Sequence, residues 1–168
     1  MQIPDLERQS SSPCAPQNLK RIKMIVTEIY QLKKGEPCLI PLFADPVEAG
    51  FPSPADDYLD EMLDLNEHLI KNPTATFMVR AKGDSMINAG IRSGDLLVVD
   101  KSLEAANEDI VIAMIDGHFT VKRLRRSGGT LRLVPENPAH SPIVINSESN
   151  VEIWGVVTNV IHSTRRSR

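Results

Sequence analysis

Short runs in which apolar and polar residues alternate make up most of the chain from residue 76 onward. In residues 76–81, Phe77, Val79 and Ala81 recur with a period of two, which is typical of a half-buried strand. Turn residues separate such runs, and Asp116-Gly117 is a strong hairpin turn. The pattern predicts further strands at residues 96–99, 110–115, 119–124, 130–134, 143–145 and 151–161. These short strands predict a mainly β fold, a small antiparallel β-sheet or partly closed barrel.

The first 40 residues have a different pattern and predict a flexible N-terminal arm. Residues 1–18 are rich in Ser, Pro and Gln, a composition typical of disorder. In residues 19–34 the apolar positions Leu19, Ile22 and Val26 follow helical spacing, and Gly35 would end the helix. A short amphipathic helix that packs on its own domain or on a partner is favoured over a nucleic-acid or membrane arm.

Residues 41–54 form an extended stretch interrupted by prolines, which disfavour helix in the residue before them. The small pair Ala49-Gly50 lies within this stretch. Such a pair suits a protease subsite with little room, although a linker turn is the simpler interpretation of these residues alone. Residues 55–162 follow as the β domain, with a short helix predicted at 65–70, and residues 163–168 form a basic tail.

Composition excludes several classes of protein. Apolar residues make up 41% of the 168 residues, enough for a real core, and aromatic residues only 4%. The net charge of -3 does not favour tight autonomous binding to nucleic acid. Cys14 and Cys38 fit neither a metal site nor a disulfide framework. No apolar run approaches a membrane span and no secretory leader is evident, so we expect a cytoplasmic protein. No metal cluster is visible in the sequence, and no cofactor is expected.

The stretch Lys82-Gly83-Asp84-Ser85-Met86 directly follows the first predicted strand. Ser85 is a candidate nucleophile held on a tight turn. Gly-Asp-Ser is also ordinary turn chemistry, because Gly permits a positive φ and Asp and Ser bond to the nearby backbone. The stretch alone therefore does not decide between the two interpretations.

Lys122 is the candidate base. On the strand 119–124 its side chain shares a face with Thr120 and Leu124, a partly apolar setting. Desolvation lowers the pKa of a lysine because it penalises the charged form. A decrease of roughly three pH units corresponds to about 4 kcal/mol. A neutral amine could then take the proton of a serine hydroxyl, as in Ser-Lys peptidases. Among the histidines, His140 is the alternative base to test.

Four motifs occur in the order found in one peptidase family: Gly83-Asp84-Ser85-Met86, residues 94–100, residues 117–124 and residues 135–138. With these motifs, roughly residues 41–161 resemble the self-cleaving LexA/UmuD family. Residues 50–55 and 64–66 are similar to the UmuD branch in particular. Residues 1–40 are longer than the arm expected in that branch.

The resemblance implies that Ser85 is the nucleophile, Lys122 the general base and Ala49–Gly50 the scissile bond. Backbone N–H groups of Ser85 and Met86 are the expected oxyanion donors. It also implies a homodimer, stimulation by the RecA–single-stranded DNA filament in the SOS response, and a UmuC-type Y-family polymerase as partner in translesion synthesis. No direct sequence-specific DNA binding and no membrane association are expected.

Three alternatives remain open at this point. A LexA-type repressor would need several packed helices before the cleavage site, where the pattern predicts one. A signal-peptidase-like enzyme also uses Ser and Lys but works at a membrane. In a non-catalytic β interaction module, Ser85 would be only a turn residue.

Overall fold

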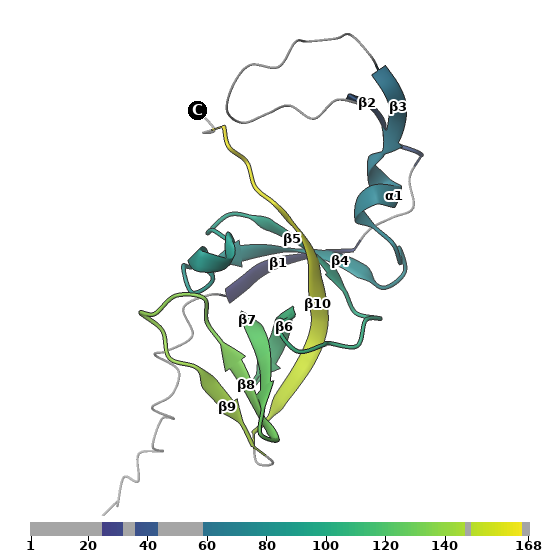
Figure 1. Ribbon diagram of the computed structural model, residues 1–168. Coiled ribbons are helices and arrows are strands. Elements are labelled where there is room, and N and C mark those ends of the chain that lie inside the picture. Colours follow the sequence, from purple (N-terminus) through teal and green to yellow (C-terminus); the bar gives the residue numbers. More distant parts are fainter. Residues whose placement is uncertain (1–24, 32–35, 44–58, 147–148, 166–168) are drawn as a thin grey trace, which may run out of the picture.

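The computed structural model describes residues 25–31, 36–43, 59–146 and 149–165, and these form a mainly β protein (Figure 1). Helical structure in this part of the chain is limited to α1 (Leu65–Leu69) and a single 3-10 turn at Ile87–Ala89. The strands are β1 (Ile25–Gln31), β2 (Leu39–Phe43), β3 (Leu59–Asp64), β4 (Thr76–Lys82), β5 (Leu96–Asp100), β6 (Ile110–Ile115), β7 (His118–Ser127), β8 (Thr130–Val134), β9 (Ile143–Ile145) and β10 (Val151–Ile161).

Eight strands form one antiparallel sheet in the order β1-β4-β5-β10-β6-β7-β8-β9. β10 lies at the centre between β5 and β6, and Figure 1 shows it running through the middle of the molecule. The β6–β7 hairpin closes at Asp116 and Gly117, whose φ angles of 48° and 79° are those that a two-residue hairpin turn requires.

The sheet is strongly curled but not closed. Three strands separate β4 from β7 in the sheet order, yet β1, which is hydrogen-bonded to β4, also lies against β7. Within the described ranges, the edge strands β1 and β9 do not pair with each other. The mainly β, antiparallel fold class is therefore confirmed, and the curl is what brings residues of β4 and β7 together.

Two apolar clusters fill the two sides of the curled sheet. The first contains residues of β4, β5, β6 and β7 and extends to Met86 and Ile91, which anchor the segment after β4. The second is built on Val111, Leu124 and Leu133. Val121 belongs to the first cluster and Leu124 to the second, so β7 is buried on both faces.

β2 and β3 form a separate two-stranded sheet, which Figure 1 shows standing apart from the large one and joined to it through α1. Asp64 caps α1 by accepting a hydrogen bond from the Asn66 backbone at 2.9 Å. The short helix predicted at 65–70 is confirmed, with an end one residue earlier.

The helix predicted at residues 19–34 is wrong where the structure describes that segment. Ile25–Gln31 is strand β1, paired with β4, while residues 19–24 and 32–34 lie outside the described ranges. Ile25, Val26 and Thr27 are β-branched residues that favour strands, and the edge of β4 offers them backbone partners. The apolar spacing was compatible with both structures.

All seven strands predicted after residue 75 are present, four of them with the predicted bounds. β3, which contains the acidic residues Asp60, Glu61 and Asp64, was not predicted. The cleavage-segment residues 44–54, and with them the Ala49–Gly50 pair, lie outside the described part of the chain.

Candidate active site

Ser85 lies on the turn that directly follows β4. Gly83 has a φ of 111°, a conformation that favours glycine, and it lets the chain leave the strand sharply. Its N–H donates to the Ser93 hydroxyl at 3.3 Å. Ser85 and Met86 have no exposed surface, and Met86 packs in the first apolar cluster. The packing of Met86 in this cluster therefore fixes the turn that carries Ser85.

Lys122 lies in the buried middle of β7 and is only 3% exposed. Its Nζ donates to three uncharged oxygens: Ser85 Oγ at 2.9 Å, Thr120 Oγ1 at 3.0 Å and the Val121 carbonyl at 2.9 Å. Burial lowers the pKa of Lys122 from 10.5 to about 8. A substantial fraction of neutral amine is therefore present just above physiological pH.

The two side chains come from positions 37 residues apart and meet because the sheet curls. A nucleophile hydroxyl in hydrogen-bond contact with a weakly basic amine is the arrangement that Ser-Lys acyl transfer needs. Thr120 is the third member of the group; its place on the same face of β7, two residues before Lys122, was visible in the sequence.

Comparison with known proteins agrees with this geometry. A family model described as Peptidase S24-like matches residues 41–158, a range that includes Ser85, Lys122 and the Ala49–Gly50 pair. The chain belongs to the peptidase S24-like family.

Three relatives of this S24-like chain match most of its length. Protein ImpA of Salmonella typhimurium is 51% identical over 134 residues, covering 76% of this chain and 87% of that protein. Protein SamA of Salmonella typhimurium strain LT2 is 54% identical over 125 residues, covering 74% and 86%. Protein MucA of Escherichia coli is 43% identical over 121 residues, covering 71% and 82%.

His140, the alternative candidate base, contacts the residue before Ser85. Its Nε2 lies 2.9 Å from Asp84 Oδ1, while the Ser85 hydroxyl accepts from Lys122. Of these two side chains, Lys122 is thus the one in contact with Ser85, and His140 contacts Asp84 instead, which the sequence did not reveal.

Two other histidines form hydrogen bonds with residues other than Ser85. His162 Nδ1 bonds the buried Asp95 carboxylate at 2.7 Å, and His118 Nδ1 lies 3.0 Å from the Asp116 carbonyl. Among the described residues, no group of three or more His, Cys, Asp and Glu side chains is placed to hold a metal. No helix in the described ranges is long and apolar enough to cross a membrane.

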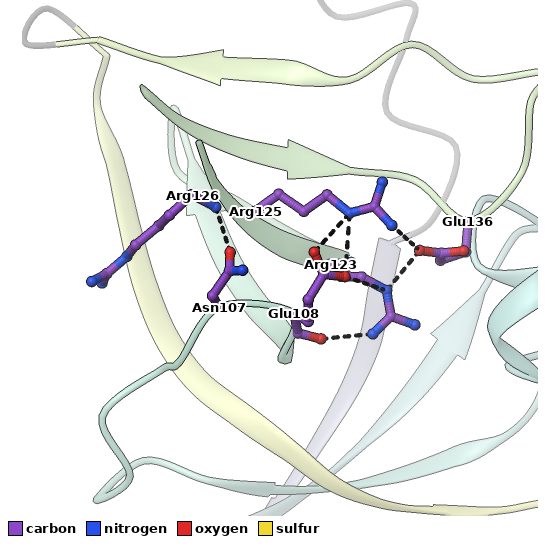
Figure 2. Close-up of polar contacts among 6 residues, drawn as sticks. All are labelled: Asn107, Glu108, Arg123, Arg125, Arg126 and Glu136. Atoms are coloured by element: carbon purple, nitrogen blue, oxygen red, sulfur yellow. Dashed lines mark hydrogen bonds and ion pairs between the residues drawn. The ribbon is translucent and has the colours of Figure 1, made fainter. Parts of the chain in front are cut away.

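An ion-pair network joins the second half of β7 to Glu108 and Glu136 (Figure 2). Arg123 Nε lies 2.6 Å from Glu136 Oε1, and Arg125 Nε lies 3.1 Å from Glu108 Oε1. Arg123 Nη1 also donates to the Glu108 carbonyl at 2.6 Å. Arg123 and Arg125, which follow Lys122 on β7, are therefore paired with carboxylates, and their charge is partly neutralised.

Proposed function

We propose that this S24-like protein cleaves its own Ala49–Gly50 bond, with Ser85 as nucleophile and Lys122 as general base. The observation that carries the proposal is the 2.9 Å contact between Lys122 Nζ and Ser85 Oγ in a buried site. Burial keeps the amine a weak enough base to be partly neutral, and the contact gives it direct access to the hydroxyl proton.

The reaction begins when neutral Lys122 accepts the Ser85 Oγ proton as Oγ attacks the Ala49 carbonyl carbon. Backbone N–H groups of Ser85 and Met86 stabilise the oxyanion that forms. The bond from the Ala49 carbon to the Gly50 nitrogen then breaks, and the Lys122 ammonium gives its proton to that nitrogen. Neutral Lys122 then takes a proton from water as the water oxygen attacks the acyl-enzyme ester. The Lys122 ammonium returns that proton to Ser85 Oγ as the ester bond breaks, which releases the Ala49 carboxyl group and regenerates Ser85.

Access of the bond to Ser85 is the natural point of control. The Ser85 side chain has no exposed surface, and the proposed reaction requires the Ala49 carbonyl to reach its hydroxyl. Because the substrate is part of the same chain, its effective concentration is high once the segment is seated. An activator therefore needs to favour the seated arrangement and does not need to supply chemistry.

The resemblance to the UmuD branch supplies the biological setting of the proposal. The protein acts in the SOS response as a homodimer, and the RecA–single-stranded DNA filament favours the cleavable arrangement. The trimmed form then serves an error-prone Y-family polymerase of the UmuC type in translesion synthesis. This role places the protein in the cytoplasm and requires no cofactor and no sequence-specific DNA contact. The matches to ImpA, SamA and MucA, which cover 82–87% of those proteins and 71–76% of this chain, support this branch over a repressor.

The decisive experiment is intact mass after incubation of wild type, Ser85→Ala and Lys122→Ala at neutral and alkaline pH. Two fragments that meet at Ala49/Gly50, produced faster in alkali and absent from both variants, would establish the reaction and its two residues. The same mixture with RecA, single-stranded DNA and ATP tests the activator. Wild type that stays intact under every condition would refute the proposed peptidase activity.

A further inference from the structure

The loop after β8, residues 135–140, contacts the turn that carries Ser85 at three points. The Asn88 N–H donates to the Glu136 carbonyl at 2.9 Å. Asn137 Nδ2 donates to the Asp84 carbonyl at 3.0 Å, and His140 Nε2 lies 2.9 Å from Asp84 Oδ1. Two of the three contacts therefore hold the single residue that precedes the nucleophile.

The contact to the Asp84 carbonyl has a geometric consequence for the next residue. The Asp84 carbonyl and the Ser85 N–H belong to one planar peptide unit, so they point in opposite directions and rotate together. The Asp84 oxygen accepts from the Ile87 N–H at 3.3 Å and, at the shorter distance of 3.0 Å, from Asn137 Nδ2. Donors that fix the carbonyl oxygen also fix the direction of the Ser85 N–H. In the proposed reaction this N–H is an oxyanion donor, whose effect depends on being oriented in advance.

The contact to the Asp84 carboxylate acts on the same peptide unit from its side chain. The His140 side chain is 6% exposed, whereas that of Asp84 is 59% exposed. A carboxylate only accepts hydrogen bonds, so His140 Nε2 carries the proton and donates. The buried imidazole thus restrains an exposed side chain that would otherwise rotate freely in water.

The loop is itself well anchored. Asn137 accepts from the Ala139 N–H through its Oδ1 and from the His140 N–H through its carbonyl, each at 3.0 Å. At its start, the Glu136 carboxylate pairs with Arg123, the residue after Lys122 on β7 (Figure 2). One loop therefore connects the strand that carries the base to the turn that carries the nucleophile.

We propose that Asn137 and His140 are positioning residues that orient the Asp84–Ser85 peptide unit, so that its N–H faces the oxyanion formed at Ala49. The inference rests on the proposed function and adds residues that do not touch the reacting atoms. It predicts that their loss lowers the rate of self-cleavage without changing the protonation of Lys122.

The test compares self-cleavage rates of Asn137→Ala, His140→Phe and His140→Gln across pH 6 to 11. Removing an oxyanion donor outright costs about 100-fold or more, so a misdirected one should cost about 10- to 100-fold in Asn137→Ala. His140→Phe keeps an aromatic ring but lacks the Nε2–H donor, and this variant should cleave itself several-fold more slowly. His140→Gln restores an amide donor and should recover most of the rate. Ser141→Ala, an exposed change next to the loop, is the matched control.

The pH profile separates positioning from general loosening of the site. If the variants only loosened the structure, water would reach Lys122 and the midpoint of the profile would move upward. If the residues act by positioning, the variants should keep the wild-type midpoint of the pH profile and cleave themselves at a lower rate. A shifted midpoint, a wild-type rate in Asn137→Ala, or no recovery in His140→Gln would overturn it.

A second measurement does not depend on cleavage. In the Ser85→Ala background, Asn137→Ala should shift the amide resonance of position 85 while the amides of β10 stay in place. An unmoved resonance overturns the positioning role whatever the activity. If the resonance moves but the wild-type protein stays intact under every condition, the positioning role stands and the proposed function is rejected.

Discussion

At the scale of single residues, burial of Lys122 sets the pH at which the proposed reaction runs. Its pKa is lowered to about 8, so about one molecule in ten holds the neutral amine at pH 7. We expect the self-cleavage rate to rise about tenfold per pH unit below pH 8 and to level off above it. First-order rate constants from intact mass between pH 6 and pH 10 measure the profile.

Lys122→Arg is the matched control for that profile. A guanidinium stays protonated at every pH used, so this variant should remain uncleaved from pH 6 to pH 10. A wild-type self-cleavage rate that does not depend on pH below 8, or one that still increases above pH 10, would contradict the assignment of Lys122 as the base with a lowered pKa.

The same lysine should make folding stability depend on pH. Between pH 8 and 10.5 the unfolded chain binds a proton on Lys122 and the folded chain does not, because the folded pKa is the lower one. Stability therefore rises with pH in this window, by about 3 kcal/mol in total. Urea unfolding of Ser85→Ala, which cannot cleave, should show this rise at pH 10.5 over pH 8.

Other groups titrate in that range, so a difference between two proteins isolates the effect of Lys122. The double variant Ser85→Ala, Lys122→Met keeps every other titrating group and lacks the amine. It should lose the additional rise of about 3 kcal/mol. Equal pH dependence in the single and double variants would show that Lys122 keeps its ordinary proton affinity in the folded state.

The residues of the site differ in how far sequence could reveal them. Ser85 and Lys122 follow from motifs and from the face that Lys122 shares with Thr120, which are local patterns. The Asp84–His140 contact joins positions 56 residues apart and leaves no local pattern. His140 could be singled out as a histidine worth testing, but only the folded loop shows that it faces Asp84 and not Ser85.

At the scale of elements, the strands after residue 75 were predictable because alternation and turn chemistry are local. β1 was not predictable in this way, since its apolar positions also fit a helix. The segment is a strand because it pairs with β4. The acidic residues of β3 hid its pairing with β2. These errors fall where a partner strand, rather than the segment's own pattern, determines the structure.

The pairing of β10 with β5 leaves no room for a side chain at Gly155. A Cβ there would lie 2.7 Å from Val99 Cγ1 and 3.1 Å from the Asp100 carbonyl oxygen. Since backbone cannot yield easily, Gly155→Ala should lower the free energy of unfolding by about 1–3 kcal/mol. Urea unfolding in the Ser85→Ala background measures it. Glu152→Ala, exposed on the same strand, is the control, and equal stability of the two variants would mean that β10 shifts at little cost.

At the scale of the whole molecule, the candidate active site exists because the sheet curls. Ser85 and Lys122 belong to parts of the sheet separated by three strands, and no pattern within either strand says that they meet. β1 takes part in this arrangement, because it pairs with β4, lies against β7 and packs Val26 on the cluster that holds Met86. A strand upstream of the proposed scissile bond thus supports the fold around Ser85.

Cleavage at Ala49–Gly50 would divide two strand pairs between the fragments. β1 and β2 lie before the bond, whereas their partners β4 and β3 lie after it. Without the covalent link, the first fragment is held only by pairing and packing, and its loss makes β4 an edge strand. We therefore expect amides of β4 that bond to β1 to exchange about fivefold faster or more, since each backbone hydrogen bond contributes about 1 kcal/mol.

Hydrogen exchange of full-length Ser85→Ala against the same variant limited to residues 50–168 tests this expectation. Protection should fall in β4 and stay unchanged in β10, which keeps both neighbours in either protein. Equal protection of β4 would mean that β1 contributes nothing to the sheet next to Ser85. A fall in β10 as well would mean that the first 49 residues stabilise the whole domain, so that cleavage loosens the protein globally and not only beside the nucleophile.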